Sequence, residues 1–184
     1  MEALYKNIHQ DLIDQCMEGD EKAQFRLYKM YYKAMYSVSL RIVNNEVEAE
    51  DIMQEAFLSV FRKIKTYKGE VSFGAWLKKV VVNRSLDYLK KKKVYFEEIN
   101  ERTTEVPDYQ MKTKDVDIRA IKKAIHELPD GYRVVLSLYL IEGYDHDEIS
   151  QILGISNSAS RTQLLRAKNK LRELLKGKEI FSYN

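Results

Sequence analysis

The 184-residue chain is 45% hydrophobic and 32% charged, and it contains only two prolines and seven glycines. This composition is typical of a mostly helical globular protein with one domain or two small ones. It argues against a membrane protein, since no apolar run approaches the ~20 residues that cross a bilayer. It also excludes an internal disulfide framework, since Cys16 is the single cysteine. The N-terminus lacks the pattern of a signal peptide, so we expect a cytoplasmic protein with no membrane insertion of its own.

The net charge of +3 is distributed unevenly along the chain. Residues 1–95 carry a net charge of +4, residues 96–118 one of −4, and residues 119–184 one of +3. The central segment also has little hydrophobic periodicity, as is typical of a linker. We therefore predict an all-α protein with two small helical domains, 1–95 and 119–184, joined by a flexible acidic linker, 96–118.

Three helices are predicted in the N-terminal domain. Asp20 is a suitable N-cap, and the first helix then has one apolar stripe: Leu27, Tyr31, Met35, Val38 and Ile42. Asn44 and Asn45 interrupt this pattern. The second helix, 47–67, has an apolar face made of Ile52, Ala56, Val60 and Ile64, and a third helix is expected at 73–93.

The second helix also carries an acidic strip opposite its apolar face. The strip residues recur at spacings of three and four: Glu48, Asp51, Glu55, Leu58 and Arg62. Such a strip is most often a solvated face. It can also be half of an interface with a basic partner helix, and the exposed leucine keeps that possibility open.

Residues 67–93 mix aromatic side chains with cations. The aromatics are Tyr67, Phe73, Trp76 and Tyr88, and the cations are Lys68, Lys78, Lys79, Arg84 and the four lysines at 90–93. Unpaired bases stack on aromatic faces while lysines hold phosphates. Gly69 and Gly74 suggest a loop that leads into a helix, with the aromatics around a base-sized hollow. The alternative, an amphipathic helix with a solvated basic end, is equally compatible with this segment.

The C-terminal domain begins with two predicted helices. The first runs from Ile118 to Pro129, and the second ends near Gly143. Residues 145–175 then predict a helix-turn-helix. Asp145 and Glu148 form a capping box, and the turn at 154–156 supplies a glycine for positive φ, a buried isoleucine and a serine N-cap.

The second helix of this motif has the composition of a DNA-recognition helix. One face carries Ser160, Leu164, Ala167, Leu171 and Leu174, and the others display Asn157, Ser158, Arg161, Thr162, Leu165, Arg166 and Asn169. Arginine suits guanine edges, asparagine suits adenine, and threonine or leucine suits a thymine methyl group. Seven cations against one acid over 161–178 favour DNA binding over a merely solvated helix.

No catalytic constellation is present in the sequence. His9, His126 and His146 fall in different segments, without cysteine or acid at metal-ligand spacing, and each is interpreted as a surface or helix-end residue. We find no phosphate-binding glycine loop and no nucleophile motif. We therefore expect no enzyme activity, no metal and no cofactor.

Taken together, these blocks resemble the extracytoplasmic-function (ECF) group of bacterial RNA polymerase sigma factors. The N-terminal blocks are AEDIMQEAF at 49–57, FxxWL at 73–77 and NxxxDYL at 83–89. The C-terminal blocks are LP at 128–129, EG at 142–143, EISQILGIS at 148–156 and RA at 166–167. The resemblance covers roughly residues 15–177 in the order and spacing of the family.

The resemblance implies a sigma factor that directs core RNA polymerase to promoters and starts strand opening. Domain 1–95 would be sigma region 2, and its core-polymerase-binding residues would be Glu48, Asp51, Gln54, Glu55 and Leu58. The minus-ten element would be bound by Lys68, Phe73, Trp76, Lys79, Asn83 and Arg84, with 68–73 as the loop that captures a flipped base. Domain 119–184 would be region 4, which would contact the minus-thirty-five element through Asn157, Ser158, Arg161, Thr162, Leu165 and Arg166. The family also implies an anti-sigma partner, and a linker in the RNA path of the polymerase.

Two departures from the family and two alternatives stay open at this point. The family commonly has a β-branched apolar residue at Ser160 and often an arginine at Gln163, so helix packing and a DNA contact are in doubt there. The main alternative is a conventional helix-turn-helix regulator whose N-terminal half senses a ligand or dimerises. A more distant one is a helical protein that binds RNA or the ribosome.

Overall fold

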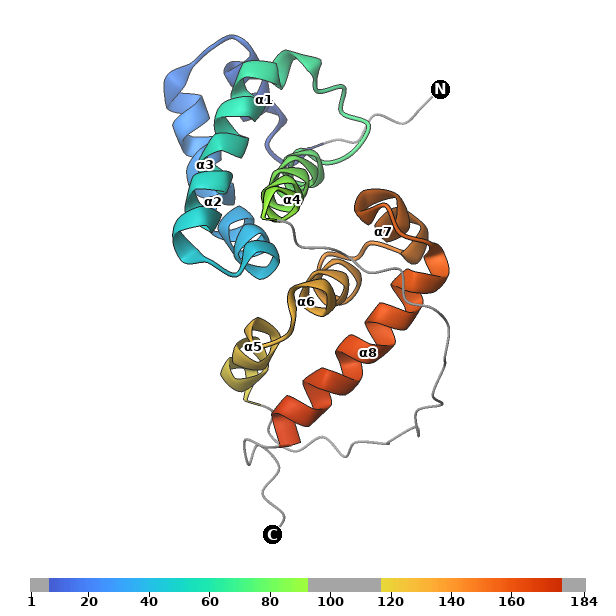
Figure 1. Cartoon of the computed structure of the whole chain (residues 1–184). Helices are drawn as coiled ribbons and strands as arrows, with labels where there is room; N and C mark the ends of the chain where they lie inside the picture. The colour runs from blue at the N-terminus through green and yellow to red at the C-terminus, as the bar shows by residue number, and fades with distance from the viewer. Residues whose placement is uncertain (1–6, 93–116, 177–184) are drawn as a thin grey trace. The chain divides into compact units, whose positions relative to one another are not determined.

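The computed structural model describes residues 7–92 and 117–176, and every regular element in those ranges is a helix. The chain divides into two compact units, Met1–Lys92 and Lys93–Asn184 (Figure 1). The predicted all-α fold with two helical domains is therefore confirmed. The predicted acidic linker lies outside the described residues as far as residue 116.

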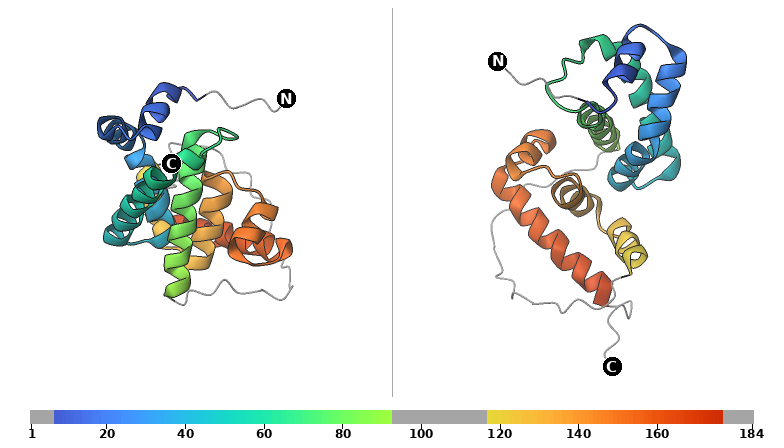
Figure 2. Two further views of the ribbon diagram at one scale, coloured as in Figure 1. Left: turned by 90° about the horizontal axis from the view of Figure 1, so that it is seen from above. Right: turned by 180° about the vertical axis from the view of Figure 1, so that it is seen from behind.

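The N-terminal unit is a helical bundle built around one long helix. Its elements are α1 (Gln10–Met17), α2 (Glu21–Val43), α3 (Glu46–Lys63), the 3₁₀ turn η1 (Ile64–Thr66) and α4 (Phe73–Lys91). Helix α2 packs against α1, α3 and α4, and α3 also packs against α4 (Figure 2). Helix α1 was not predicted from the sequence, because it is short and no side chain caps its N-terminus.

Local capping sets where these helices begin and end. The Asp20 carboxylate accepts from the backbone N–H groups of Lys22 and Ala23, as predicted. Asn44 ends α2 in the left-handed region at φ 55°, and Asn45 caps α3. The predicted second helix extended to residue 67, but the α-helix ends at Lys63 and continues only as η1.

The predicted apolar stripes form the core of the N-terminal unit. Buried residues of α2, α3 and α4 meet there, among them Leu27, Val38, Ile42, Ile52, Ala56, Val60, Leu77 and Val81. A small polar contact lies inside this core, where the Ser85 hydroxyl is 3.1 Å from that of Ser39. Serine side chains at this position let α2 and α4 approach closely without leaving a buried hydroxyl unpaired.

The C-terminal unit contains five helical elements in its described part. They are α5 (Ile118–His126), α6 (Asp130–Leu136), its π-helical continuation η2 (Ser137–Ile141), α7 (His146–Leu153) and α8 (Asn157–Lys176). Helix α8 packs against α5, α6 and α7 (Figure 2). Arg133 of α6 is buried in this unit. Its guanidinium donates to the carbonyl of Leu128 and forms an ion pair with Asp130.

The helix-turn-helix geometry is confirmed in detail. The Asp145–Glu148 capping box is present at the start of α7. Gly154 lies in the left-handed region at φ 69°, where a side chain would be strained. Ile155 is buried in the turn, and the Ser156 hydroxyl accepts from the backbone N–H of Ala159 at 3.1 Å. The α7–α8 angle is thus held by capping and by one buried apolar residue.

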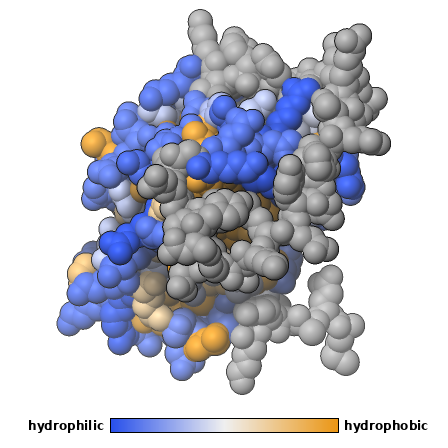
Figure 3. Space-filling model, turned by 90° about the horizontal axis from the view of Figure 1, so that it is seen from below, coloured by the Kyte–Doolittle hydropathy of each residue, from blue (hydrophilic) through white to orange (hydrophobic). Residues whose placement is uncertain are grey.

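Where the face drawn in Figure 3 shows described residues, it is mainly hydrophilic, with smaller apolar patches. No helix in these segments is both long and apolar enough to cross a membrane. Several large apolar side chains are nevertheless exposed, among them Phe25, Val47, Leu58, Leu140 and Ile141. Leu58 belongs to the acidic strip of α3.

Candidate functional site

The acidic strip of α3 lies on an exposed face. Asp51, Gln54 and Glu55 are exposed, Glu48 is half-buried, and Leu58 is 59% exposed. Beside Leu58 an open hollow of about 400 Å³ is lined by Gln24, Leu58, Phe61 and Arg62. An apolar side chain and a hollow within a charged strip are the usual components of a protein-binding surface.

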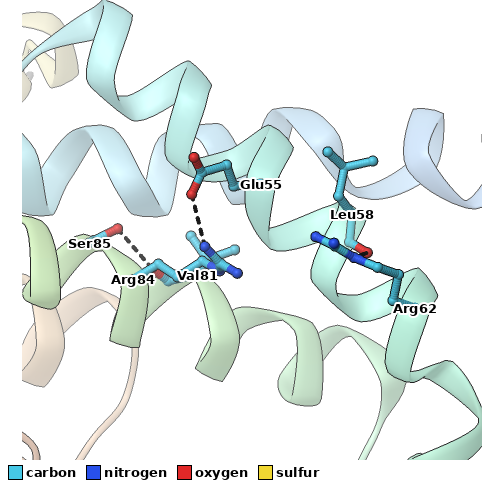
Figure 4. Close-up of polar contacts among 6 residues, drawn as sticks. All are labelled: Glu55, Leu58, Arg62, Val81, Arg84 and Ser85. Atoms are coloured by element: carbon cyan, nitrogen blue, oxygen red, sulfur yellow. Dashed lines mark hydrogen bonds and ion pairs between the residues drawn. The ribbon is translucent and has the colours of Figure 1, made fainter.

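Glu55 and Arg84 form an ion pair between the residues predicted to bind core polymerase and those predicted to bind the minus-ten element. Arg84 Nη1 lies 2.9 Å from Glu55 Oε2, and the Arg84 side chain is only about one-third exposed (34%). Figure 4 shows this pair bridging α3 and α4, with Leu58 and Arg62 further along α3. The sequence did not predict this contact. Glu55 is therefore partly neutralised within the chain. Asp51 forms no ion pair with any residue that the structure describes, so it is the better probe of the strip.

The outer face of α4 carries three of the predicted minus-ten residues. Trp76, Lys79 and Asn83 are spaced by three and four residues, so they lie along one side of the helix. Lys79 and Asn83 are exposed and Trp76 is half-buried. Lys68 is exposed in the loop 68–72, which precedes the helix. These four side chains are available to a ligand.

Phe73 does not belong to this exposed set, which corrects the prediction. Its side chain is 0% exposed, and its ring packs edge-on against Tyr31, Tyr67 and Trp76 at centroid distances of 5.5–5.9 Å. Gly74 permits this packing, because a Cβ there would lie 2.9 Å from the Tyr31 ring. The aromatic rings therefore fill the space in which a base-sized hollow was expected.

The predicted minus-thirty-five residues lie along α8, and two of them are linked. Ser158 and Arg161 are exposed, whereas Asn157, Thr162, Leu165 and Arg166 are half-buried. Arg161 Nε donates to Asn157 Oδ1 at 2.8 Å. The Asn157 amide in turn donates to Asp147 of α7 at 2.6 Å. These two hydrogen bonds hold the Arg161 guanidinium at the start of α8.

The two departures at Ser160 and Gln163 have structural explanations. Ser160 is fully buried, and its hydroxyl lies 2.8 Å from Nδ1 of His146, so the serine supports the helix interface instead of loosening it. Gln163 is only 2% exposed, so its side chain is part of the α8 interior and not a DNA contact. His146 begins α7 as a helix-end residue, but it is 9% exposed and stacks on the Tyr139 ring. Its interpretation as a surface or helix-end residue therefore holds for the helix end, although the side chain is buried.

Burial lowers the pKa of His146. The cations of Arg161 and Lys168 lower it further, while the carboxylates of Asp145 and Asp147 oppose the shift. Because the folded-state pKa lies below the unfolded value of about 6.5, the unfolded chain takes up a proton first as the pH falls. Stability is therefore complete above that unfolded pKa and is lost as the pH falls through it toward the folded one.

We expect the fragment 117–176 to lose thermal stability as the pH falls below about 6.5. The double variant His146→Phe, Ser160→Ala replaces both partners of the buried hydrogen bond and should lose this part of the pH dependence. A phenyl ring at 146 keeps the stacking on Tyr139 but does not titrate. The comparison is between unfolding curves of the two proteins across the acidic range. Equal slopes for the two proteins would show that His146 does not contribute.

Cys16 is buried beside α2, and its surroundings make it unreactive. Burial raises its pKa to about 11, with Asp20 adding to the effect. The thiol therefore stays protonated at neutral pH, whereas the thiolate is the nucleophile. Within residues 7–92 and 117–176, no group of three or more His, Cys, Asp or Glu side chains could hold a metal ion.

Comparison with known proteins matches both units to one family. The model of Sigma-70 region 2 matches residues 27–94, and that of Sigma-70, region 4 matches residues 118–171. The chain belongs to the ECF group of RNA polymerase sigma factors. As a sigma factor it directs core RNA polymerase to promoters. The region 2 match decides against a conventional regulator with a sensing or dimerising N-terminal half.

The similarity to known ECF sigma factors extends over most of the chain. The ECF RNA polymerase sigma-E factor of Haemophilus influenzae is 26% identical over 90% of this chain and 96% of its own. The sigma factor SigW of Bacillus subtilis is 29% identical over 89% and 95% of the two chains. Sigma factors are transcription initiation factors and not classical enzymes.

Two solved structures share the fold. The structure of CnrH in complex with the cytosolic domain of CnrY has a TM-score of 0.53 at 21% identity, and covers 90% of this chain and 96% of that one. RpoE of Bartonella quintana, in complex with the anti-sigma factor NepR, has a TM-score of 0.55 at 20% identity, and covers 82% and 95%. At these identities the likeness concerns the fold alone.

Proposed function

We propose that the N-terminal unit binds core polymerase through α3 and the minus-ten element through α4. Support for this division is the Glu55–Arg84 ion pair, which ties the two helices together (Figure 4). A protein partner on α3 and a DNA strand on α4 would then be held at a set distance by one rigid bundle. This arrangement suits a factor that must place DNA relative to the polymerase.

We propose that the exposed side of α4 and the loop 68–72 hold an unstacked minus-ten base. Lys68 and Lys79 would contact phosphates, and Asn83 offers a carboxamide that can both donate to and accept from a base edge. The half-buried Trp76 is the aromatic side chain that lines up with Lys79 and Asn83 on this side of α4, since Phe73 is buried. Unstacking costs a few kcal/mol, which such contacts offset.

We propose that α8 of the C-terminal unit contacts the minus-thirty-five element in the major groove. Arg161 lies near the start of this helix, where recognition helices usually meet base edges. The hydrogen bond that its Nε donates to Asn157 Oδ1 orients the guanidinium before DNA arrives. Preorganisation of this kind lowers the entropy cost of binding.

We also propose a cytoplasmic location, where promoter DNA is present, and an anti-sigma partner. RpoE of Bartonella quintana was solved with an anti-sigma factor, and this chain shares its fold. The exposed Leu58 beside a hollow on α3 is a suitable surface for such a partner. The acidic linker would lie in the RNA path of the polymerase, and the chain would have no catalytic activity of its own.

Reconstitution with core RNA polymerase tests this function. The purified chain should make the polymerase start transcription at defined sites on genomic DNA fragments, with a shared pair of elements upstream. The controls are core polymerase alone and the chain alone. Random initiation, or binding of the chain to an operator as a dimer without polymerase, would contradict the proposal.

A further inference from the structure

One buried side chain near the N-terminus holds both ends of the loop 68–72. Asn7 is 7% exposed, and its Oδ1 accepts from the backbone N–H of Phe73 at 2.8 Å. Its Nδ2 donates to the Tyr67 hydroxyl at 2.9 Å and to Gln10 Oε1 at 3.0 Å. Tyr67 precedes the loop and Phe73 follows it, so one carboxamide, 60 or more residues away in sequence, closes the loop.

The Tyr67 hydroxyl extends this closure into the loop. It donates a hydrogen bond to the carbonyl oxygen of Val71. Hydrogen bonds therefore hold the loop at Tyr67 before it, at Val71 within it and at Phe73 after it. Tyr67 is itself 8% exposed and packs on Trp76 at a centroid distance of 5.1 Å. With the backbone fixed in this way, the loop presents the exposed side chains of Lys68, Glu70 and Val71.

Asn7 also acts as a second cap on α4. The Phe73 N–H is one of the four at a helix N-terminus that have no partner within the helix. Ser72 satisfies a different one, the N–H of Ala75, at 3.2 Å. Asn7 therefore fixes the first residue of the helix that carries Lys79 and Asn83.

We infer that Asn7 is a positioning residue for minus-ten recognition. It touches no DNA itself, and it holds the loop and the start of α4 in the arrangement that selects the captured base. This inference rests on the proposed role of the loop 68–72 in base capture. It assigns a part in promoter opening to a residue outside the region 2 match, which begins at residue 27.

The test uses the full chain with core polymerase, on a promoter recovered by the transcription assay above. Asn7→Ala should slow strand opening by about tenfold, which is the effect expected when one or two hydrogen bonds are lost. Permanganate reactivity of the opened bases measures the rate. The ratio of opening rates between the preferred minus-ten base and its substitutes should fall toward one. Affinity for core polymerase and for minus-thirty-five duplex should stay within about twofold of wild type.

Three further variants separate positioning from general stability. Tyr67→Phe keeps the ring packing without the hydroxyl and should reproduce the defect. Asn7→Asp keeps an acceptor for the Phe73 N–H and should restore opening to within about threefold of wild type. Gln10→Ala is the matched control, because it removes the Asn7 bond that does not reach the loop, together with a bond to Asp14 within α1, and it should behave as wild type.

The loop variant Lys68→Ala, Val71→Ala tests base capture independently of Asn7. If that variant changes base preference while Asn7→Ala leaves opening and the base ratio unchanged, Asn7 has no positioning role and the proposed function stands. If the loop variant also leaves both unchanged, base capture by this loop is wrong and the inference fails with it. A loss of core affinity equal to the loss of opening, with the base ratio preserved, would reduce Asn7 to a fold-stabilising residue and overturn the inference.

Discussion

Leu58→Asp is expected to weaken the affinity for core polymerase by at least ~2 kcal/mol, about thirtyfold. Leu58 protrudes from α3 beside the hollow lined by Phe61 and Arg62, as an apolar anchor would. A carboxylate there would lose its hydration at the interface and would add charge to an already acidic strip. The fold should tolerate the change, since surface substitutions usually alter stability by less than about 0.5 kcal/mol. Titration of labelled sigma factor with core polymerase measures the loss.

Met30→Asp is the matched control for this variant. Met30 is another exposed apolar residue of the same bundle, but it lies on α2, and it should bind as wild type. Asp51→Lys tests the charge of the strip separately, and its effect should diminish as salt is raised. Wild-type affinity for both Leu58→Asp and Asp51→Lys, with unchanged circular dichroism, would show that α3 is not the polymerase interface.

Arg161→Ala is expected to cost ~1–3 kcal/mol on the cognate minus-thirty-five sequence and little on scrambled DNA. The guanidinium is exposed and is oriented by Asn157, which is itself hydrogen-bonded to Asp147 of the preceding helix. Losing a base contact removes discrimination, whereas losing a phosphate contact does not. Binding of the fragment 117–176 to both duplexes at several salt concentrations measures the difference.

Lys168→Ala is the comparison for Arg161. Lys168 lies two turns further along α8, with its ammonium 6.0 Å from the centre of the Tyr139 ring. We expect this substitution to weaken binding to both duplexes alike and to reduce the salt slope by about one contact. If both variants reduce cognate and scrambled binding by equal factors, α8 attracts DNA by charge alone and Arg161 does not select bases.

Local signals made much of this molecule predictable from its sequence. Asp20, the Asp145–Glu148 capping box and Gly154 act within a few residues of themselves, so their effects were predicted correctly. The apolar stripes and the acidic strip follow from helical periodicity in the same way. These features determined the helices, the helix-turn-helix and the family resemblance.

Side-chain environments that depend on distant residues were decided only by the tertiary structure. Phe73 was expected on DNA and is buried, because Gly74 lets Tyr31 of another helix cover it. Ser160 was expected to weaken packing, yet it is bonded to His146, a pairing that no periodicity indicates.

The sequence by itself determined an all-α chain of two domains with an exposed strip on α3, and it predicts DNA recognition by α8. Capping and hydrophobic periodicity are short-range, so they can be identified along the chain. The tertiary structure decided which candidate residues are exposed, and it revealed the closure of the loop by Asn7 and the Glu55–Arg84 pair. Those contacts join residues 29 to 66 positions apart, and only the packing of the helices of the N-terminal unit, α1 included, brings them within hydrogen-bond distance.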